Sequence, residues 1–281
     1  MLKQRIITAL VMLVVLLPAL FYPNTLAFMV VAGLLIAAGS WEWGNLNQCQ
    51  PVTALVLAGL MAFACFGIWL VGAVDLRLPK LWIGVGALWV LGGIWLLRGG
   101  VAAWSKVPRL LRLMIGLLAL LAAWLAVVQA RGLGINFLVS CLVLVWIADI
   151  AAYFAGRAVG GRFFRAKLAP TISPGKTWEG ALGGMIGVML GAWIWRSMDA
   201  STATSDLSIF TRLGQTGELF MFLSVGFLAA MSVVGDLVES LFKRSAGFKD
   251  SSGLLPGHGG VLDRLDALLP VLPLAMMFAS L

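Results

Sequence analysis

Long apolar runs are the feature that most constrains how this chain can fold. Hydrophobic residues make up 61% of the 281-residue chain and charged residues only 11%, so water would not tolerate the resulting surface. The runs long enough to cross the ~30 Å hydrocarbon core of a bilayer cover residues 6–22, 27–46, 52–74, 81–97, 113–130, 135–155, 178–195, 218–242 and 267–281. The sequence therefore predicts an all-α, polytopic integral membrane protein with about nine transmembrane helices.

The distribution of lysine and arginine predicts the orientation of this bundle. A net charge of +8 could suit a nucleic acid or an anionic lipid, but the basic residues fall in loops between the runs. If the amino terminus is cytoplasmic, about three quarters of the 20 basic residues lie inside, as basic loops tend to. We therefore expect a cytoplasmic amino terminus, an outside carboxyl terminus, a lipid bilayer as partner and no nucleic acid.

The chain divides into amino-terminal membrane helices, residues 1–130, and carboxyl-terminal membrane helices with cytoplasmic loops, residues 131–281. The first part offers little chemistry. Glu42, an acid near the end of an apolar run, is expected to be an interfacial carboxylate that reaches water beside two tryptophans. The first run lacks a convincing cleavage site and is expected to stay as a span. The three cysteines have no CxxC spacing and are interpreted as small hydrophobic residues.

Two polar features open the second part. Asp149 lies inside the run 135–155, where an unpaired charge costs ~2.5–3.5 kcal/mol or more, so it is either functional or paired with Arg157 to hold two helices. Residues 173–180 then combine a hydroxyl, a turn, Lys176 and a helix start. Exposed amide groups at such a start could bind a phosphate, although the spacing of a P-loop is absent.

The eighth run ends in a polar stripe. Asp236, Glu239, Ser240 and Lys243 follow the spacing i, i+3, i+4 and i+7, so a helix would place them on one face. The carboxylates lie toward the membrane and the lysine toward the cytoplasm, which suits a metal and a phosphate stacked along the axis. Snorkelling of the basic end explains Lys243 but not Asp236.

Residues 240–266 form a charged, glycine-rich segment in an otherwise apolar chain. Asp266 alone is explained by complementarity with a helix dipole, whereas this account is weaker for Asp263. Two carboxylates from different helices, Asp236 and Asp263, flanked by basic residues, form the arrangement that Mg²⁺ and a polyphosphate need. His258, the only histidine, is a poor zinc site by itself and either orients a phosphate or the loop or is structural.

These residues resemble the signature of the phosphatidate cytidylyltransferases, also called CDP-diacylglycerol synthases. The matching positions are Ser240, Lys243, Arg244, Lys249, Asp250, Ser252, Leu255, Pro256, His258, Gly259, Gly260, Asp263, Arg264, Leu265 and Asp266. The resemblance reaches back through Asp236 and residues 173–180 to Asp149. It implies an enzyme of the bacterial inner (cytoplasmic) membrane, with its active site facing the cytoplasm. Such an enzyme joins CTP to phosphatidic acid, with Mg²⁺ as cofactor, and releases CDP-diacylglycerol and pyrophosphate.

The resemblance also implies roles for individual residues. Asp236 and Asp263 would hold the metal, and Asp149, Glu239 and Asp266 would be further metal ligands or structural acids. The remaining residues fall into a catalytic group, Lys243, Arg244, Lys249, Asp250, His258 and Arg264, and a substrate-binding group, Ser173, Lys176, Ser240, Gly259 and Gly260. No general base is needed, because a phosphate monoester is already anionic at neutral pH. A homodimer is left open.

Two other functions compete with this interpretation. A CTP-dependent lipid kinase would use the same cations and metal but transfer the γ-phosphoryl group, giving CDP and a phosphorylated lipid. A transporter for an anionic solute would use Asp149 and Asp236 as coupling residues. The transporter predicts polar residues in both halves and an internal repeat, and the sequence shows neither.

Overall fold

The helices of this protein follow its apolar runs. The computed structural model describes residues 2–202 and 205–281, and within these ranges the regular elements are helices. Their bounds are α1 Leu2–Phe21, α2 Thr25–Leu46, α3 Pro51–Leu70, the short 3₁₀ turn η1 Ala73–Asp75, α4 Pro79–Ser105, α5 Arg109–Leu133, α6 Ile135–Val159, α7 Trp178–Thr202, α8 Ile209–Thr216, α9 Glu218–Ser245, α10 Leu262–Leu265 and α11 Leu268–Ala279. The all-α prediction is confirmed.

Seven helices are long and apolar enough to cross a membrane, namely α1 to α6 and α9, so the structure is that of a polytopic membrane protein. The expected count of nine is not reached among the described residues. The run 178–195 became α7, which carries Glu179, Arg196 and Asp199. The run 267–281 became α11, whose 12 residues reach only about 18 Å at 1.5 Å per residue. The cytoplasmic amino terminus and the outside carboxyl terminus stay predictions.

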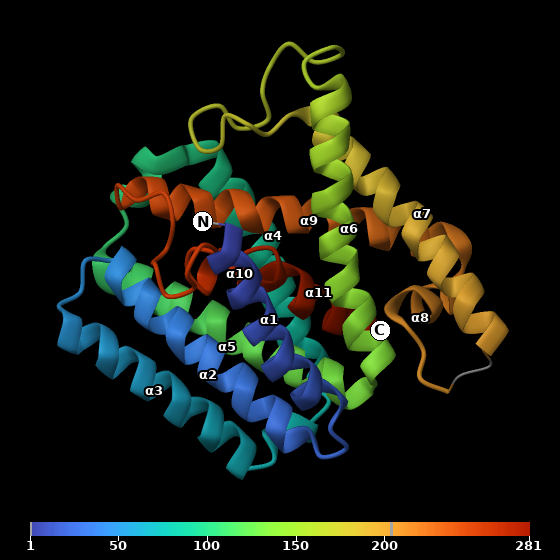
Figure 1. The fold of residues 1–281 in the computed structure, drawn as a ribbon, viewed down its shortest axis with the longest axis horizontal. Coiled ribbons are helices and arrows are strands. Elements are labelled where there is room, and N and C mark those ends of the chain that lie inside the picture. The colour runs from blue at the N-terminus through green and yellow to red at the C-terminus, as the bar shows by residue number, and fades with distance from the viewer. Residues whose placement is uncertain (1, 203–204) are drawn as a thin grey trace.

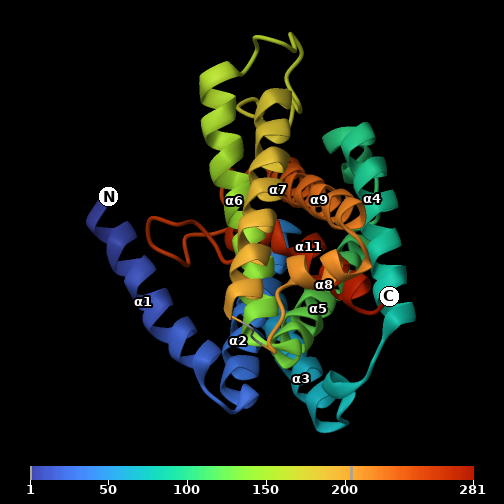
Figure 2. The same ribbon diagram turned by 90° about the vertical axis from the view of Figure 1, so that its right-hand side faces the viewer.

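The helices form two groups that meet at α9 and α11. Figure 1 shows α2, α3 and α5 running side by side, with α6 and α7 as a second pair, and α9 passing across the molecule behind α6. α11 lies in the interior, where it packs against α4, α5 and α9. Figure 2 shows α1 standing away from the rest toward its amino end. There the Arg5 and Thr8 side chains donate hydrogen bonds to the carbonyls of Gly257 and Pro256, at 3.1 and 2.9 Å.

Small residues allow α6 and α7 to lie unusually close. The face of α7 toward α6 carries Gly180, Gly183, Gly184, Gly187 and Gly191. A methyl group added at Gly184 would stand 2.8 Å from the backbone carbonyl oxygen of Ala148 on α6. Helices in lipid associate through such close packing, because the hydrophobic effect supplies no force between them. This contact fixes α6, and with it Asp149, relative to the loop that leads into α7.

We expect Gly184→Ala to destabilise the protein. The added methyl group must push the two helices apart, and overpacking of this kind costs about 1–3 kcal/mol. The melting temperature in detergent should fall by several degrees. Gly67→Ala on α3 is the matched control, because an added methyl group there meets nothing within 4 Å. An equal fall for both variants would contradict the close contact between α6 and α7.

Candidate active site

The polar stripe predicted on α9 exists and is held by ion pairs. The Nζ atom of Lys243 lies 2.5 Å from Glu239 Oε2 on the same helix and 2.5 Å from Asp263 Oδ1 on α10. All three side chains are largely buried, with at most 12% of each exposed. A buried ion pair is costly unless each charge is compensated, so Lys243 ties α10 to α9.

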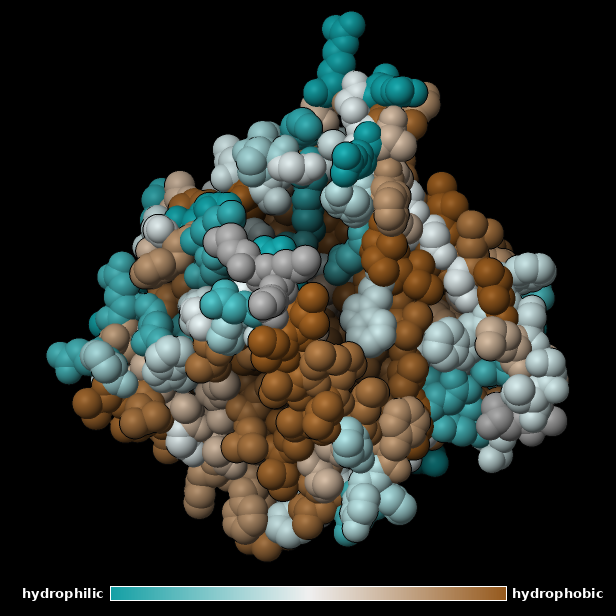
Figure 3. Space-filling view, viewed as in Figure 1, coloured by the Kyte–Doolittle hydropathy of each residue, from teal (hydrophilic) through white to brown (hydrophobic). Residues whose placement is uncertain are grey.

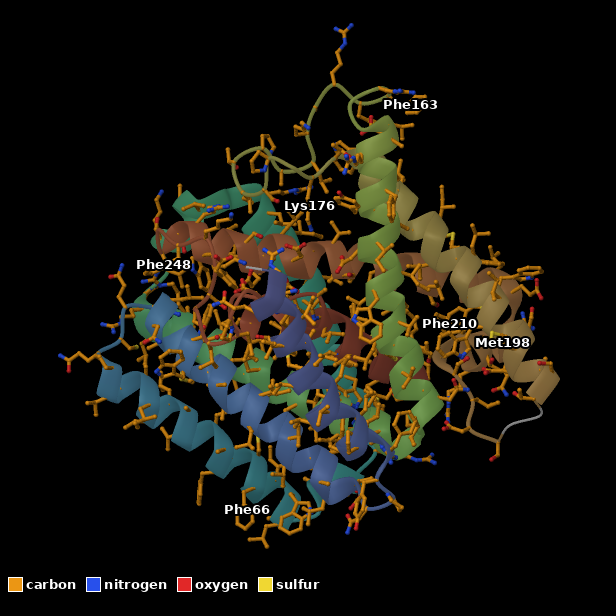
Figure 4. All side chains as sticks on the ribbon, viewed as in Figure 1. Phe66, Phe163, Lys176, Met198, Phe210 and Phe248 are labelled. Carbon is orange, nitrogen blue, oxygen red and sulfur yellow. The ribbon has the colours of Figure 1, made fainter. Side chains whose placement is uncertain are left out.

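A second ion pair joins the stripe to the loop before α7. Lys176 Nζ lies 2.5 Å from Asp236 Oδ2, and Ser240 donates its hydroxyl to the other oxygen of Asp236 at 3.3 Å. Figure 4 shows Lys176 between the loop and α9. The loop is braced by Glu179, which accepts hydrogen bonds from the amides of Phe163 and Phe164, both at 3.0 Å. Ser173 stands in the turn of this loop, where its own amide donates to Ala169 O at 2.8 Å.

Asp263 is the most highly coordinated acid of the cluster. Its Oδ2 atom accepts hydrogen bonds from the amide and hydroxyl of Ser251, both at 2.9 Å, and from the Gly260 amide at 2.7 Å. Burial alone would raise the pKa of Asp263, but the bonds from Lys243 and from these amides lower it below its usual range. Asp263 is therefore an anion in the folded protein.

Asp266 has the opposite electrostatic environment. Burial, followed by the negative charges of Asp236 and Asp149, raises the pKa of Asp266 to about 7. Its backbone lies against α9 at Gly235, where even a methyl side chain would collide with the Asp266 carbonyl. The acids of α6, α9 and the start of α11 thus approach one another closely enough to repel.

A hollow of about 430 Å³ with charged residues in its wall contains part of this cluster. It is lined by residues of α6, the loop before α7, and α9, among them Asp149, Tyr153, Arg157, Lys176, Thr177 and Asp236. Figure 3 shows hydrophilic residues gathered in the upper half of the molecule, above the hydrophobic surface of the helices. The alternative of a helix-holding Asp149–Arg157 pair is not what forms, since Arg157 donates to the Tyr153 hydroxyl at 2.9 Å.

The other predicted residues surround the cluster without joining its ion pairs. Arg264 donates to the His258 carbonyl at 2.8 Å, and Arg244 donates to the Phe248 carbonyl at 3.4 Å. Both guanidinium groups are exposed, as are Lys249 and Asp250. The Gly259 carbonyl accepts from Leu255 at 2.8 Å and closes the loop. The structure brings these residues to one end of α9, and their individual roles stay predictions.

Glu42 is the residue that the sequence interpretation placed wrongly. It was expected at the interface with water, but its side chain is 0% exposed. Instead of water, it binds the loop and the start of α10, more than 200 residues later in the chain, through four hydrogen bonds. A carboxylate inside an apolar run is itself the signal that could have found it, because such a group needs buried partners.

The cluster fits a divalent cation by its chemistry. Five carboxylates converge there, Asp149, Asp236, Glu239, Asp263 and Asp266, and their oxygens are the ligands that Mg²⁺ prefers. Lys176 and Lys243 pair with three of them, and the Oε1 atom of the buried Glu239 accepts no hydrogen bond from the described residues. No three of the described acids lie close enough together to form a metal-binding group. The two predicted ligands, Asp236 and Asp263, form ion pairs with Lys176 and Lys243 instead.

An apolar cavity of about 320 Å³ adjoins the same ion pairs. Its wall comes from α2, α4, α5 and α9 and includes Trp43, Gly92, Trp104 and Phe242. Its lining also includes Glu239, which is paired with Lys243, and Leu262, which precedes Asp263 on α10. The charged cluster therefore borders both the hollow that contains Asp149, Lys176 and Asp236 and the apolar cavity.

Comparison with known proteins identifies the family to which this chain belongs. The model of a family described as "Cytidylyltransferase family" matches residues 3–281. A phosphatidate cytidylyltransferase from Pseudomonas aeruginosa is 38% identical, with 100% of this chain and 97% of the relative covered. One from Haemophilus influenzae is 37% identical, with 99% and 98% covered. A Brucella suis relative of the same name is 40% identical over 53% of this chain. Since the match runs along the whole bundle, this chain belongs to the cytidylyltransferase family.

Proposed function

We propose that this protein is a Mg²⁺-dependent phosphatidate cytidylyltransferase that converts CTP and phosphatidic acid to CDP-diacylglycerol and pyrophosphate. The observation that carries the proposal is the pair of lysines, Lys176 and Lys243, held against three carboxylates from α9 and α10 at one end of α9. Full-length relatives bearing that name support it. The same proposal assigns the protein to the bacterial inner membrane, with this end of α9 facing the cytoplasmic CTP pool.

The reaction needs positioning and charge compensation more than acid–base chemistry. An anionic oxygen of the lipid phosphate attacks the α-phosphorus of CTP, and a new P–O bond forms. The bond from that phosphorus to the bridging oxygen of the β-phosphate breaks, and pyrophosphate leaves with the electron pair. The lipid phosphate is already ionised at neutral pH, so no side chain has to remove a proton.

The chain's cations do the binding. Lys176 and Lys243 can exchange a carboxylate partner for a phosphate oxygen without losing charge compensation. Arg244, Lys249 and Arg264 are exposed around the same end of α9 and can reach a triphosphate or a lipid headgroup. Ser240 and Ser173 supply hydroxyl donors. The scheme uses residues of one chain only, so it would operate in the same way in each subunit of a homodimer.

The carboxylates would hold the cofactor. Asp236 and Asp263 are the proposed ligands, and Asp149, Glu239 and Asp266 are proposed as further ligands or structural acids. When bound, Mg²⁺ neutralises phosphate charge as it develops at the leaving group. The carboxylates' own part is to fix the position of positive charge relative to the lysines. Their mutual repulsion, expressed in the raised pKa of Asp266, favours any cation that relieves it.

The apolar cavity gives the lipid a place beside the charged cluster. A phosphatidic acid whose phosphate reaches Lys243 can place part of one acyl chain among Trp43, Trp104 and Phe242. Because the acyl chain comes from lipid and not from water, its packing against the cavity wall would set its contribution to binding. The CTP phosphates would approach instead from the hollow that contains Asp149, Lys176 and Asp236.

Replacement of Asp263 tests the reaction. We expect Asp263→Asn to lower the rate by about 10²- to 10³-fold, the size seen when one preorganised electrostatic group is removed from a site. The measurement is conversion of radiolabelled CTP by solubilised protein with phosphatidic acid and Mg²⁺, with the products separated. Asp75→Asn, at an exposed position on η1, is the control and should keep full activity. Formation of CDP and a phosphorylated lipid by the wild type would instead identify a kinase.

A bulky side chain in the apolar cavity tests the acyl-chain site. Gly92→Phe should raise the KM for dioleoyl phosphatidic acid by about tenfold, because overpacking an apolar site that has to hold the chain costs about 1–3 kcal/mol. The KM for a dibutanoyl substrate should change little. Gly84→Phe is the matched control, since Gly84 also lies on α4 with open space around it but outside the cavity. A uniform change for both substrates would place the acyl chains elsewhere.

The raised pKa of Asp266 predicts how stability depends on pH. Folded Asp266, whose pKa is raised to about 7, keeps its proton up to about that pH, whereas in the unfolded chain it ionises near the ordinary pKa of 3.8. The unfolded state therefore binds fewer protons between these values, and its formation becomes easier as pH rises. In EDTA, the melting temperature should fall between pH 4.5 and 7.5. Asp266→Asn should flatten this slope, and an unchanged slope in the variant would assign it to other groups.

A further inference from the structure

Glu42 of α2 is buried in an environment built to hold a carboxylate. Its Oε1 atom accepts from the Ser252 hydroxyl at 2.5 Å and the Val261 amide at 2.9 Å. Its Oε2 atom accepts from the Leu262 amide at 2.7 Å and the Ser251 hydroxyl at 3.2 Å. These four donors are neutral, and the side chain is 0% exposed. Without such bonds a buried carboxylate would be strongly unfavourable.

The same donors belong to the segment that holds Asp263. Ser251 gives its amide and its hydroxyl to Asp263 Oδ2, and the Gly260 amide binds the same atom. The Ser251 hydroxyl has a single proton, so Glu42 and Asp263 share it. Glu42 therefore binds the segment on both sides of the Asp263 binding site, through the hydroxyls of residues 251–252 and the backbone amides of residues 261–262.

The packing leaves little freedom in this arrangement. Gly260 lies so close to Glu42 and Ser251 that a methyl group on its Cα would overlap the Glu42 Oε1 and Ser251 Oγ atoms. The backbone at residue 260 therefore lies in close contact with Glu42 on one side and donates its amide to Asp263 on the other. Any displacement of the Glu42 carboxylate changes the position from which the Gly260 amide reaches Asp263.

We infer that Glu42 is a positioning residue for the cation-binding acid Asp263, acting through residues 251–262 and touching neither substrate. The inference rests on the proposed function for its catalytic consequence, but its structural part stands on contacts alone. It makes the amino-terminal helices part of the active-site architecture. Loss of the Glu42 charge should loosen the segment, so that Asp263 loses its fixed distance from Lys243.

The test compares two buried acids that are held in the same way. In Glu42→Gln, one oxygen that accepts hydrogen bonds becomes an amide group that repels its donors. Asp199→Asn on α7 is the matched control. Asp199 is also buried and accepts hydrogen bonds from neutral groups, namely Ser208, Thr211 and Asn136, in the bundle formed by α6, α7 and α8.

The first measurement is hydrogen exchange of metal-free protein, read by mass spectrometry. Glu42→Gln should speed exchange in peptides covering residues 258–263 by at least about tenfold, as loss of a bond to a charged group implies. Asp199→Asn should leave these peptides unchanged. Unchanged exchange in Glu42→Gln, or equal acceleration in Asp199→Asn, would overturn the inference. If Glu42→Gln does not fold, Ser252→Ala should produce a smaller acceleration of exchange at the same peptides. Unchanged exchange in Ser252→Ala would then overturn the inference.

The second measurement is the Mg²⁺ dependence of nucleotide-lipid formation. Glu42→Gln should need about tenfold more Mg²⁺ for its half-maximal rate, while Asp199→Asn should need the wild-type amount. Faster exchange with an unchanged Mg²⁺ requirement would make Glu42 purely structural and reject the positioning role. A wild-type protein that forms no nucleotide-lipid would reject the proposed function instead, and the exchange result would still decide the contacts of Glu42.

Discussion

The compensation of charge at Lys243 is the constraint on which the rest of the structure depends. The ammonium group of Lys243 is largely buried in the last turn of α9, so it has to be paired. Removing one partner of a buried ion pair costs about 3–5 kcal/mol. Glu239 supplies one partner from the same helix, but the second, Asp263, must be brought from a separate element. This requires α10 to pack against α9. The last helix, α11, follows α10 directly and therefore enters the interior, where it packs against α4 and α5. The same pairing keeps a cation ready for a phosphate that can replace the carboxylate.

Local patterns were sufficient for much of this arrangement. The i, i+3, i+4, i+7 spacing on α9 predicted one polar face, and there Glu239 pairs with Lys243, while Asp236 and Lys243 pair with residues of other elements. Seven of the nine apolar runs became helices fit to span a membrane. The last run failed because apolar composition does not distinguish lipid contact from burial in protein. It begins only after α10 and a break at Asp266, and it is buried along most of its length.

The missed residues share a different property, which is dependence on distant partners. Glu179 was seen only as part of a loop motif, although it holds the turn at Phe163 and Phe164. Glu42 was judged by its tryptophan neighbours, although its donors follow 209 to 220 residues later. No local periodicity encodes such a contact. What the sequence does contain is the energetic anomaly of an acid in an apolar run, which indicates that a partner exists without identifying it.

The sequence distance between Glu42 and its donors also has a consequence for biosynthesis. A ribosome that adds about 5–20 residues per second would need roughly 10 to 40 seconds to make the intervening chain. During that interval α2 carries an acid whose native donors do not yet exist, and holding an ionised one within lipid costs about 2.5–3.5 kcal/mol. Glu42 on α2 can therefore form its native hydrogen bonds only when translation is nearly complete. The last segment to be synthesised completes the burial of one of the first.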